Sequence, residues 1–459
     1  MITGIIKAKD IRLNNQRFDC SYHLSEAQNV RRVLSEMPYN ILKIEDVTFN
    51  IYNGGRYNRI YITDPSKGIK FLTGSNIQSA DLENVKIVSK KYMPGTNEML
   101  LDKDWVLITR SGTIGKCAYS NNNFKGKFGS EDIIRLIPNN KIEAGLVYAY
   151  LASKYGYALL TQGTFGAVIQ HIEPNFIKNL PIPEFPKDFQ NKIDGMIKES
   201  ARLREEAADI LKTTRNFLES ELSIPYKKLE FQTKKRNIKD ILGSLQYRLD
   251  PPAIMNSGVL SMEHVKENCE WQTLKDTGAK VRRPGIFKRI YVENGIPYIK
   301  GSEIFNRNPF RSCDHLSKNR TPFVDEMKLY EGQILLTCAG SVGDVKMITK
   351  EYEDKGAIGS QDIIRIETKD SLFTKEYLFI YLQLPFVYQF IQSMKYGSVI
   401  ERIEPFHVDS IPVVTPSLEV SNKITGMVRR YMEFSYTSFK LEDEAISLVE
   451  AEIEKWTKE

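Results

Sequence analysis

The residues that come nearest to a catalytic set are Asp314, Glu326 and Lys328. Their spacing is typical of nucleases in which two carboxylates bind a metal ion beside a lysine, so they could cleave DNA with Mg²⁺. A second segment of the chain matches this one and serves as an internal control. It carries Glu98 in place of Glu326, but Leu100 in place of Lys328. A solvated charged loop is therefore the favoured interpretation.

Other catalytic motifs are incomplete. Asn308-Pro309-Phe310 is one proline short of the tetrapeptide of a base-flipping DNA methyltransferase, and no glycine-rich cofactor loop precedes it. The sequence has no G-x-x-x-x-G-K-[ST] phosphate loop. His171 matches Arg402, which could not replace it as a metal ligand, so we interpret His171 as structural or as a phosphate contact. We expect a non-catalytic chain without a metal site or a cofactor of its own.

These comparisons depend on an internal duplication that runs through nearly the whole chain. The motif GSEDIIRL begins at Gly129 and GSQDIIRI begins at Gly359, 359 − 129 = 230 residues later. LITRSGTIGK likewise returns as LLTCAGSVGD, and GAVIQHIEP returns as GSVIERIEP, with offsets between 227 and 231. A period this long indicates tandem duplication of a whole domain and its tail, and not a solenoid.

Each copy is β-rich and is followed by a helical tail. Short runs rich in Ile, Val and aromatic residues alternate with Gly, Asn and Pro clusters, and LPIPEFP and IPVVTP form extended exits because proline restricts the backbone. After each exit the apolar period changes from about two to about three and a half. We therefore expect an α/β (α+β) fold, with domains over 1–185 and 231–415 and long helices over 186–230 and 416–459.

Both long helices share one heptad register, with mostly small residues at a and large apolar residues at d. This predicts that they pair as a coiled coil, which is antiparallel if a pseudo-twofold axis relates the two copies. The alternative is that each helix packs on its own β-rich domain. The d positions are Met196, Leu203, Ile210, Phe217, Met427, Phe434, Leu441 and Leu448.

Composition limits the class of protein. A chain of 459 residues is too long for one ordinary core, and its net charge of +6 permits a nucleic-acid partner without demanding one. No apolar run is long enough to span a membrane, and the first ten residues do not have the order of a signal peptide. Five scattered cysteines suit a reducing compartment and indicate no zinc site. We expect a cytoplasmic protein with no membrane partner.

Two similar domains at the ends of a helical rod could read two short DNA segments one or more turns apart, at roughly 34 Å per turn. The ordered set of repeated motifs, each followed by a long helix, resembles the specificity subunit of type I restriction-modification enzymes. This resemblance covers nearly the whole chain, and it is the repeated order that is specific. The IEP form of the exit motif departs from the family pattern and is associated with other restriction or phage-defence systems, which leaves the particular system open.

The resemblance implies two target-recognition domains that bind a bipartite sequence in double-stranded DNA. It implies partners as well: DNA adenine methyltransferase subunits, two of them, and through these a nuclease-translocase subunit. S-adenosylmethionine would belong to the methyltransferase, into which an adenine is flipped for DNA methylation. Two alternatives from other classes are a metal-dependent DNA-cleaving enzyme and a two-headed adaptor for protein ligands.

The residues expected to contact DNA follow from comparing the two copies, because scaffold and phosphate contacts should be shared whereas base-reading residues should differ. Arg59 and Arg289 are shared, and we assign them to phosphate or to a scaffold salt bridge. Arg suits guanine and Asn suits adenine in the major groove, although any one such residue can be a plain surface residue. The full set is Asn53, Arg56, Tyr57, Asn58, Arg59, Arg110, Lys116, Arg282, Arg283, Phe287, Lys288 and Arg289.

Overall fold

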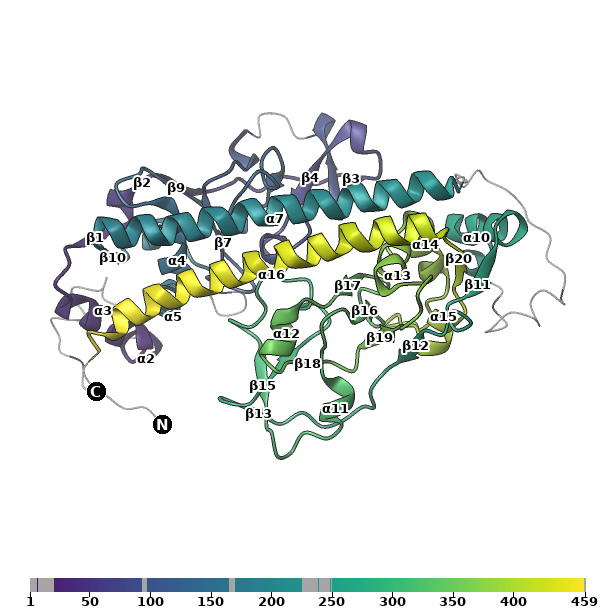
Figure 1. Ribbon diagram of the computed structural model, residues 1–459. Helices are drawn as coiled ribbons and strands as arrows, with labels where there is room; N and C mark the ends of the chain where they lie inside the picture. Colours follow the sequence, from purple (N-terminus) through teal and green to yellow (C-terminus); the bar gives the residue numbers. More distant parts are fainter. Residues whose placement is uncertain are drawn as a thin grey trace. The chain divides into compact units, whose positions relative to one another are not determined.

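The computed structural model describes residues 6, 20–92, 97–164, 170–224, 238, 248 and 250–457. These residues fold into two compact units, one of Met1–Glu205 with Thr437–Glu459 and the other of Glu206–Tyr436. Two long helices, α7 (Lys187–Leu222) and α16 (Leu418–Glu454), each contribute one half to each unit (Figure 1). The last residues of the first expected helix, 225–230, lie outside the described part of the chain.

The described residues of the first unit form three small sheets. One has the order β2-β9-β6-β7 with all neighbours antiparallel, the second has the order β3-β5-β4-β8 with β4 and β8 parallel, and the third pairs β1 with β10. The strands are β1 (Ile41–Lys43), β2 (Thr48–Asn53), β3 (Tyr61–Ile62), β4 (Gly68–Leu72), β5 (Ile87–Ser89), β6 (Val106–Thr109), β7 (Cys117–Tyr119), β8 (Phe128–Gly129), β9 (Ile133–Pro138) and β10 (Pro181–Pro183).

The second unit repeats this topology. Its sheets have the orders β12-β19-β16-β17, β13-β15-β14-β18 and β11-β20, so that ten added to each strand number of the first unit reproduces the second. The strands are β11 (Trp271–Thr273), β12 (Lys280–Arg282), β13 (Tyr291–Val292), β14 (Ile296–Ile299), β15 (Asp314–Leu316), β16 (Ile334–Thr337), β17 (Val345–Met347), β18 (Ile358–Gly359), β19 (Ile363–Glu367) and β20 (Pro412–Val414). The tandem α/β fold predicted from the duplication is confirmed.

Short helices connect the strands and cover the sheets. In the first unit α4 is almost wholly buried, because it lies in one apolar cluster with sheet residues and with residues of both long helices. The described short helices are α2 (Cys20–His23), α3 (Glu26–Glu36), α4 (Ala144–Ala152), α5 (Lys154–Gln162), α6 (Pro174–Lys178), α9 (Pro251–Met255), α10 (Ser257–Asn268), α11 (Val324–Met327), α12 (Lys350–Asp354), α13 (Lys375–Tyr381), α14 (Pro385–Ser393) and α15 (Pro405–Asp409). In the described residues, no helix is both long enough and apolar enough to cross a membrane.

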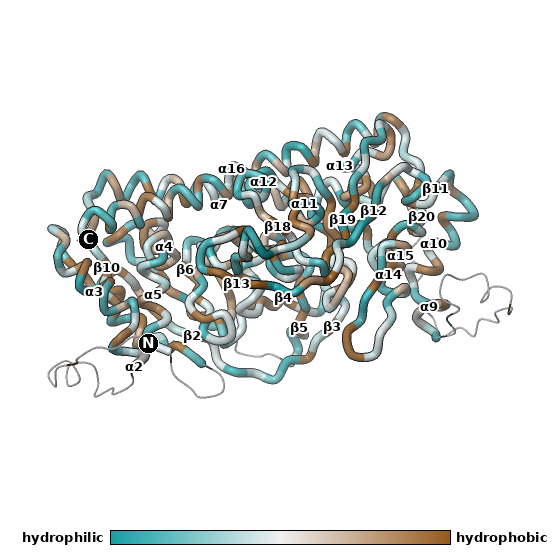
Figure 2. The backbone as a smooth tube through the Cα atoms, turned by 90° about the horizontal axis from the view of Figure 1, so that it is seen from below, coloured by the Kyte–Doolittle hydropathy of each residue, from teal (hydrophilic) through white to brown (hydrophobic). Residues whose placement is uncertain are grey.

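The two long helices pair antiparallel. In the first unit the Ser200 hydroxyl donates to the Ser438 carbonyl at 2.7 Å, and in the second unit the Lys423 ammonium lies 3.9 Å from the centre of the Phe217 ring. Moving along α7 from Ser200 to Phe217 therefore moves the contact backward along α16, from Ser438 to Lys423. Hydrophobic and hydrophilic residues alternate along both helices (Figure 2), as expected for helices with one covered and one open side.

The buried face of these helices follows the a and e positions of the heptad more closely than the d positions. Of the eight d residues only Leu203 is buried and the rest are half-buried, whereas the e residues Leu218 and Val449 are fully buried. The physical reason is that each half of a long helix packs on the sheets and short helices of the unit to which that half belongs, as well as on the other long helix. For example, the Asn121 side chain donates to the carbonyl of Ala201 at 3.0 Å. Both packing modes predicted for the helices are present together.

Candidate functional site

The repeated motif GSEDIIRL folds around a fully buried arginine. Arg135 is 0% exposed, and its guanidinium donates to the carbonyl oxygens of Ser130 at 3.1 Å and Ile133 at 2.6 Å. It also donates to the carbonyls of Met99, at 3.3 Å, and Gly129. One side chain therefore ties together the end of β8, the loop after it and the start of β9.

GSQDIIRI repeats this arrangement in the second unit. Arg365 is 0% exposed and donates to the carbonyls of Ser360 (3.4 Å), Ile363 (2.9 Å), Met327 (3.2 Å) and Gly359 (2.8 Å). A Cβ atom on Gly359 would lie 3.0 Å from a Leu329 methyl group and 3.1 Å from the guanidinium, so a larger residue would crowd this arrangement. Burial lowers the pKa of Arg365 to about 10, so it remains a cation near neutral pH. Both copies of the octapeptide therefore form the same hydrogen-bonded turn around a buried arginine.

In the first unit, side-chain contacts fix the loop that follows β2. The Tyr57 hydroxyl donates to the Glu98 carboxylate at 2.8 Å, and Arg59 forms an ion pair with Glu131. These contacts hold the loop, while the Arg56 side chain remains 90% exposed, with Nε 3.8 Å from a Glu131 oxygen. Asn58 is also exposed, and Asn53 closes the strand by donating to the carbonyl of Gly54 at 3.3 Å.

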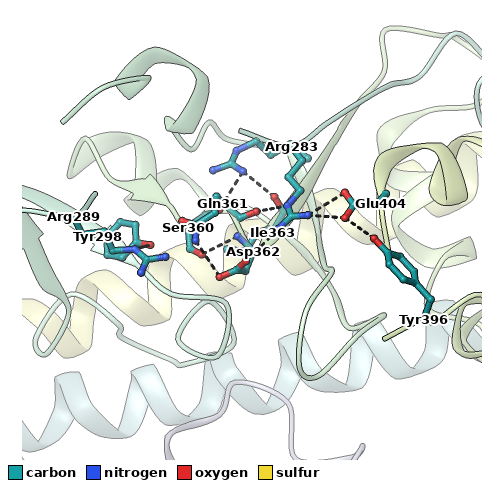
Figure 3. A network of polar contacts seen from close by, with 10 residues as sticks. Arg283, Arg289, Tyr298, Ser360, Gln361, Asp362, Ile363, Tyr396 and Glu404 are labelled. Carbon is teal, nitrogen blue, oxygen red and sulfur yellow. Dashed lines mark hydrogen bonds and ion pairs between the residues drawn. The ribbon is translucent and has the colours of Figure 1, made fainter. Parts of the chain in front are cut away.

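The corresponding loop of the second unit is held by different chemistry. Phe287 packs against the apolar cluster that contains Tyr298, and the Arg289 Nε donates to the Tyr298 hydroxyl at 2.9 Å (Figure 3). Ile286 is 81% exposed and Lys288 is exposed beside it. Each loop thus presents exposed side chains on an anchored frame, and the exposed types differ between the units.

Four further basic residues predicted at DNA have partners within their own unit. Arg110 forms an ion pair with Glu173, and the Lys116 ammonium lies 4.4 Å from the centre of the Tyr157 ring. Arg282 donates to the Glu367 carboxylate at 2.7 Å and to the Glu326 carbonyl at 2.8 Å. Arg283 donates to both carboxylate oxygens of Glu404 at 3.0 Å. The alignment of the two copies could not show these partners, because each lies 41 or more residues away along the chain.

The nuclease-like residues have ordinary ion-pair surroundings. Asp314 lies 2.6 Å from the Lys300 ammonium, and Lys328 lies 2.6 Å from Asp325. Among the residues that the structure describes, no group of three or more His, Cys, Asp or Glu side chains could hold a metal ion.

His407 supports the second unit in a way that predicts a pH dependence. Its Nδ1 accepts the backbone N–H of Glu404 at 2.9 Å, and burial lowers its pKa below the usual value near 6.5, with Arg248 acting in the same direction and Glu404 opposing. The unfolded chain therefore takes up this proton as the pH falls below about 6.5, while the folded unit resists it. The second unit should lose stability between pH 7 and pH 5.5 in thermal unfolding.

The first unit supplies the matched control, because Phe176 stands where the second unit has His407. His407→Phe should remove this part of the pH dependence, whatever its effect on stability at pH 7. An unchanged difference between pH 7 and pH 5.5 in the variant would contradict the assignment.

Comparison with known proteins identifies the family. The model of the type I restriction modification DNA specificity domain matches residues 38–199 and 267–437, which together span more than half of the chain. The chain belongs to this family. It is a non-catalytic DNA target-recognition subunit of the restriction-modification type, whose partners are DNA and the other subunits of such a system. Comparison with the curated proteins gives no match.

The solved structures that resemble this chain are of restriction proteins. The type I S subunit from M. genitalium has a TM-score of 0.36 and 15% identity, covering 92% of this chain and 97% of its own. The HsdS subunit from Thermoanaerobacter tengcongensis has a TM-score of 0.29 and 14% identity, covering 92% and 98%. The type IIG endonuclease BpuSI has a TM-score of 0.29 and 12% identity, covering 41% and 30%. The family assignment rests on the sequence match.

Proposed function

We propose that each unit reads one half of a bipartite DNA target and that the chain brings DNA adenine methyltransferase subunits to it. The observation that carries this proposal is the common topology of the two units combined with different exposed side chains at matching loop positions. Arg56 and Asn58 in the first loop stand where Ile286 and Lys288 stand in the second. A common scaffold with exchanged side chains is what two readers of different sequences require.

The exposed loop residues are the strongest candidates for base contacts. Arg56 can pair with guanine and Asn53 or Asn58 with adenine, while Lys288 can contact guanine and Ile286 a thymine methyl group. Four residues hold the loops from within: Tyr57, Arg59, Phe287 and Arg289. Any contact that they make to DNA would be to the phosphate backbone. Lys116 in the first unit and Arg282 in the second unit are candidates for phosphate contacts.

The partners follow from the same proposal. Two methyltransferase subunits would bind along α7 and α16, whose half-buried apolar residues at the d positions leave surface for a second protein. These subunits would hold S-adenosylmethionine and receive the flipped adenine. A nuclease-translocase subunit would join through them, and the chain itself would act by positioning.

Exchange of one domain tests this proposal. A host carrying the chain and its methyltransferase is mapped for methylated adenines before and after residues 1–185 are replaced by those of another family member. One half of the methylated sequence should change and the other half should persist, and exchange of residues 231–415 should give the complementary result. If both halves or neither changed, the two-reader model would be wrong.

Salt dependence separates DNA recognition from a protein-adaptor role. Binding of the complex to a target duplex should weaken steeply between 50 and 200 mM salt, because each neutralised phosphate releases counterions. Binding that is insensitive to salt would favour the adaptor.

A further inference from the structure

The exit motifs of both units place a glutamate at the same point. Glu173 in QHIEP and Glu404 in ERIEP are 231 residues apart, and each is the N-cap residue of the following short helix, α6 or α15. Each carboxylate is bound by an arginine. In the first unit the arginine is Arg110 and in the second it is Arg283, which Figure 3 shows directed at Glu404 beside the hydroxyl of Tyr396.

These two arginines come from different places in the repeated fold. Arg110 directly follows β6, and its counterpart after β16 is Cys338, which is fully buried. Arg283 directly follows β12, and its counterpart in the first unit is Asn53, the last residue of β2. The arginine has therefore changed position between the copies while its glutamate has stayed.

The backbone around this ion pair is the same in both units. The N–H of Ile172 donates to the carbonyl of Arg110 at 3.2 Å, and the N–H of Ile403 donates to the carbonyl of Cys338 at 3.0 Å. The N–H groups of Arg110 and Cys338 donate in turn to the carbonyls of Asp132 and Asp362, at 2.8 and 3.2 Å. In each copy the hairpin after β6 or β16 is thus bound to the exit motif. It is also bound to the GSxD loop, which is residues 129–132 in the first unit and 359–362 in the second.

Both arginines are largely covered. The side chain of Arg110 is 20% exposed and that of Arg283 is 14% exposed. Arg283 also donates to the carbonyl of Gln361 at 2.7 Å and lies 3.3 Å from Asp362. A guanidinium with these bonds is already committed to the protein. Releasing Arg283 for a base edge would leave the half-buried Glu404 carboxylate, 25% exposed, without its cation, and releasing Arg110 would do the same to the more exposed Glu173.

We propose that a guanidinium on the exit-motif glutamate is a positioning element of both units, supplied by Arg110 in one copy and by Arg283 in the other. This inference rests on the proposed function and refines it. The two copies differ at two matching positions, Asn53 against Arg283 and Arg110 against Cys338. Both differences then reflect one structural cation that has moved from one position to the other, and neither reflects a difference in base reading. The charged pair holds the hairpin and the GSxD loop in register, so that the exposed loop residues meet the DNA.

The transposition can be repeated by mutation. In the complex with its methyltransferase, Arg110→Cys should weaken binding to the target duplex about tenfold, the size of effect expected for losing charge-assisted hydrogen bonds, and leave the methylated sequence unchanged. Arg110→Cys combined with Asn53→Arg should restore binding to within about threefold. The second unit gives the mirror experiment, in which Arg283→Asn is rescued by Cys338→Arg.

Controls separate this inference from the proposed function. Arg32→Ala, on the exposed side of α3, should bind as the parent does, and Arg56→Ala should relax one position of the methylated sequence. If Arg56→Ala and the domain exchange both leave that sequence intact, the proposed function fails, while recovery of binding in the double variant still tests the transposition.

Three results would overturn the inference: relaxed sequence preference in Arg110→Cys, unweakened binding in that variant, or a double variant no better than the single one. If Arg110→Cys does not fold, thermal unfolding of the double variant decides. A folded double variant supports the transposed arginine, and an unfolded one refutes it.

Discussion

Arg135→Met is expected to lower the free energy of unfolding of the first unit by at least about 3 kcal/mol, because it leaves buried carbonyl oxygens without donors. Arg135 is fully buried and donates to carbonyls of four residues. Lysine should not rescue the variant, since an ammonium cannot reproduce the planar set of guanidinium donors. Hydrogen exchange of the β8 and β9 amides in the full chain measures the effect locally.

Arg365→Met is the matched variant in the second unit, and it should accelerate exchange in β18 and β19 instead. Arg56→Met is the surface control, because that side chain is 90% exposed, and it should change exchange in neither unit. Normal protection of β9 in Arg135→Met would show that the carbonyls find other donors.

Arg204→Met should have the second large effect, through the long helices. The Arg204 guanidinium lies 2.7 Å from the Glu442 carboxylate, with side chains 13% and 4% exposed, and the Tyr148 hydroxyl donates to the same carboxylate. Removing the cation leaves a buried negative charge, which typically costs about 3–5 kcal/mol. Exchange of the amides in 193–204 and 438–453 should accelerate.

Adding Glu442→Gln to Arg204→Met gives the test of mechanism. The neutral amide still accepts the Tyr148 hydroxyl but no longer carries the charge, so the double variant should be more protected than Arg204→Met alone. If the two substitutions were additive, the ion pair would not be the cause of the loss.

Much of the fold could be predicted because duplication and periodicity are written along the chain. Offsets between 227 and 231 predicted two units of one topology, and the sheets repeat strand for strand. The change of period after each exit predicted two long helices, and their antiparallel pairing was expected from the duplication. The heptad could not show that each half of a long helix also packs on the unit to which it belongs, which moves the buried face toward the e positions, including Leu218 and Val449.

The candidate site was less accessible to prediction, for a physical reason. Comparison of the copies identified Arg56 and Lys288, which are exposed, because a difference in residue type can be read directly from the two aligned sequences. It could not distinguish them from Arg110 and Arg283, whose carboxylate partners lie 63 and 121 residues further along the chain. The burial of Arg135 was equally hidden, since its acceptors are backbone carbonyls that any residue carries.

The sequence by itself determined the class of the protein: two copies of one recognition domain, long paired helices, and no complete catalytic motif. These properties reside in local pattern and in repetition. The tertiary structure decided which cations are structural, because only the folded chain brings distant carboxylates and carbonyls to a guanidinium and excludes water from it. The same basic residue type therefore supports the fold at Arg365 and is exposed at Arg56.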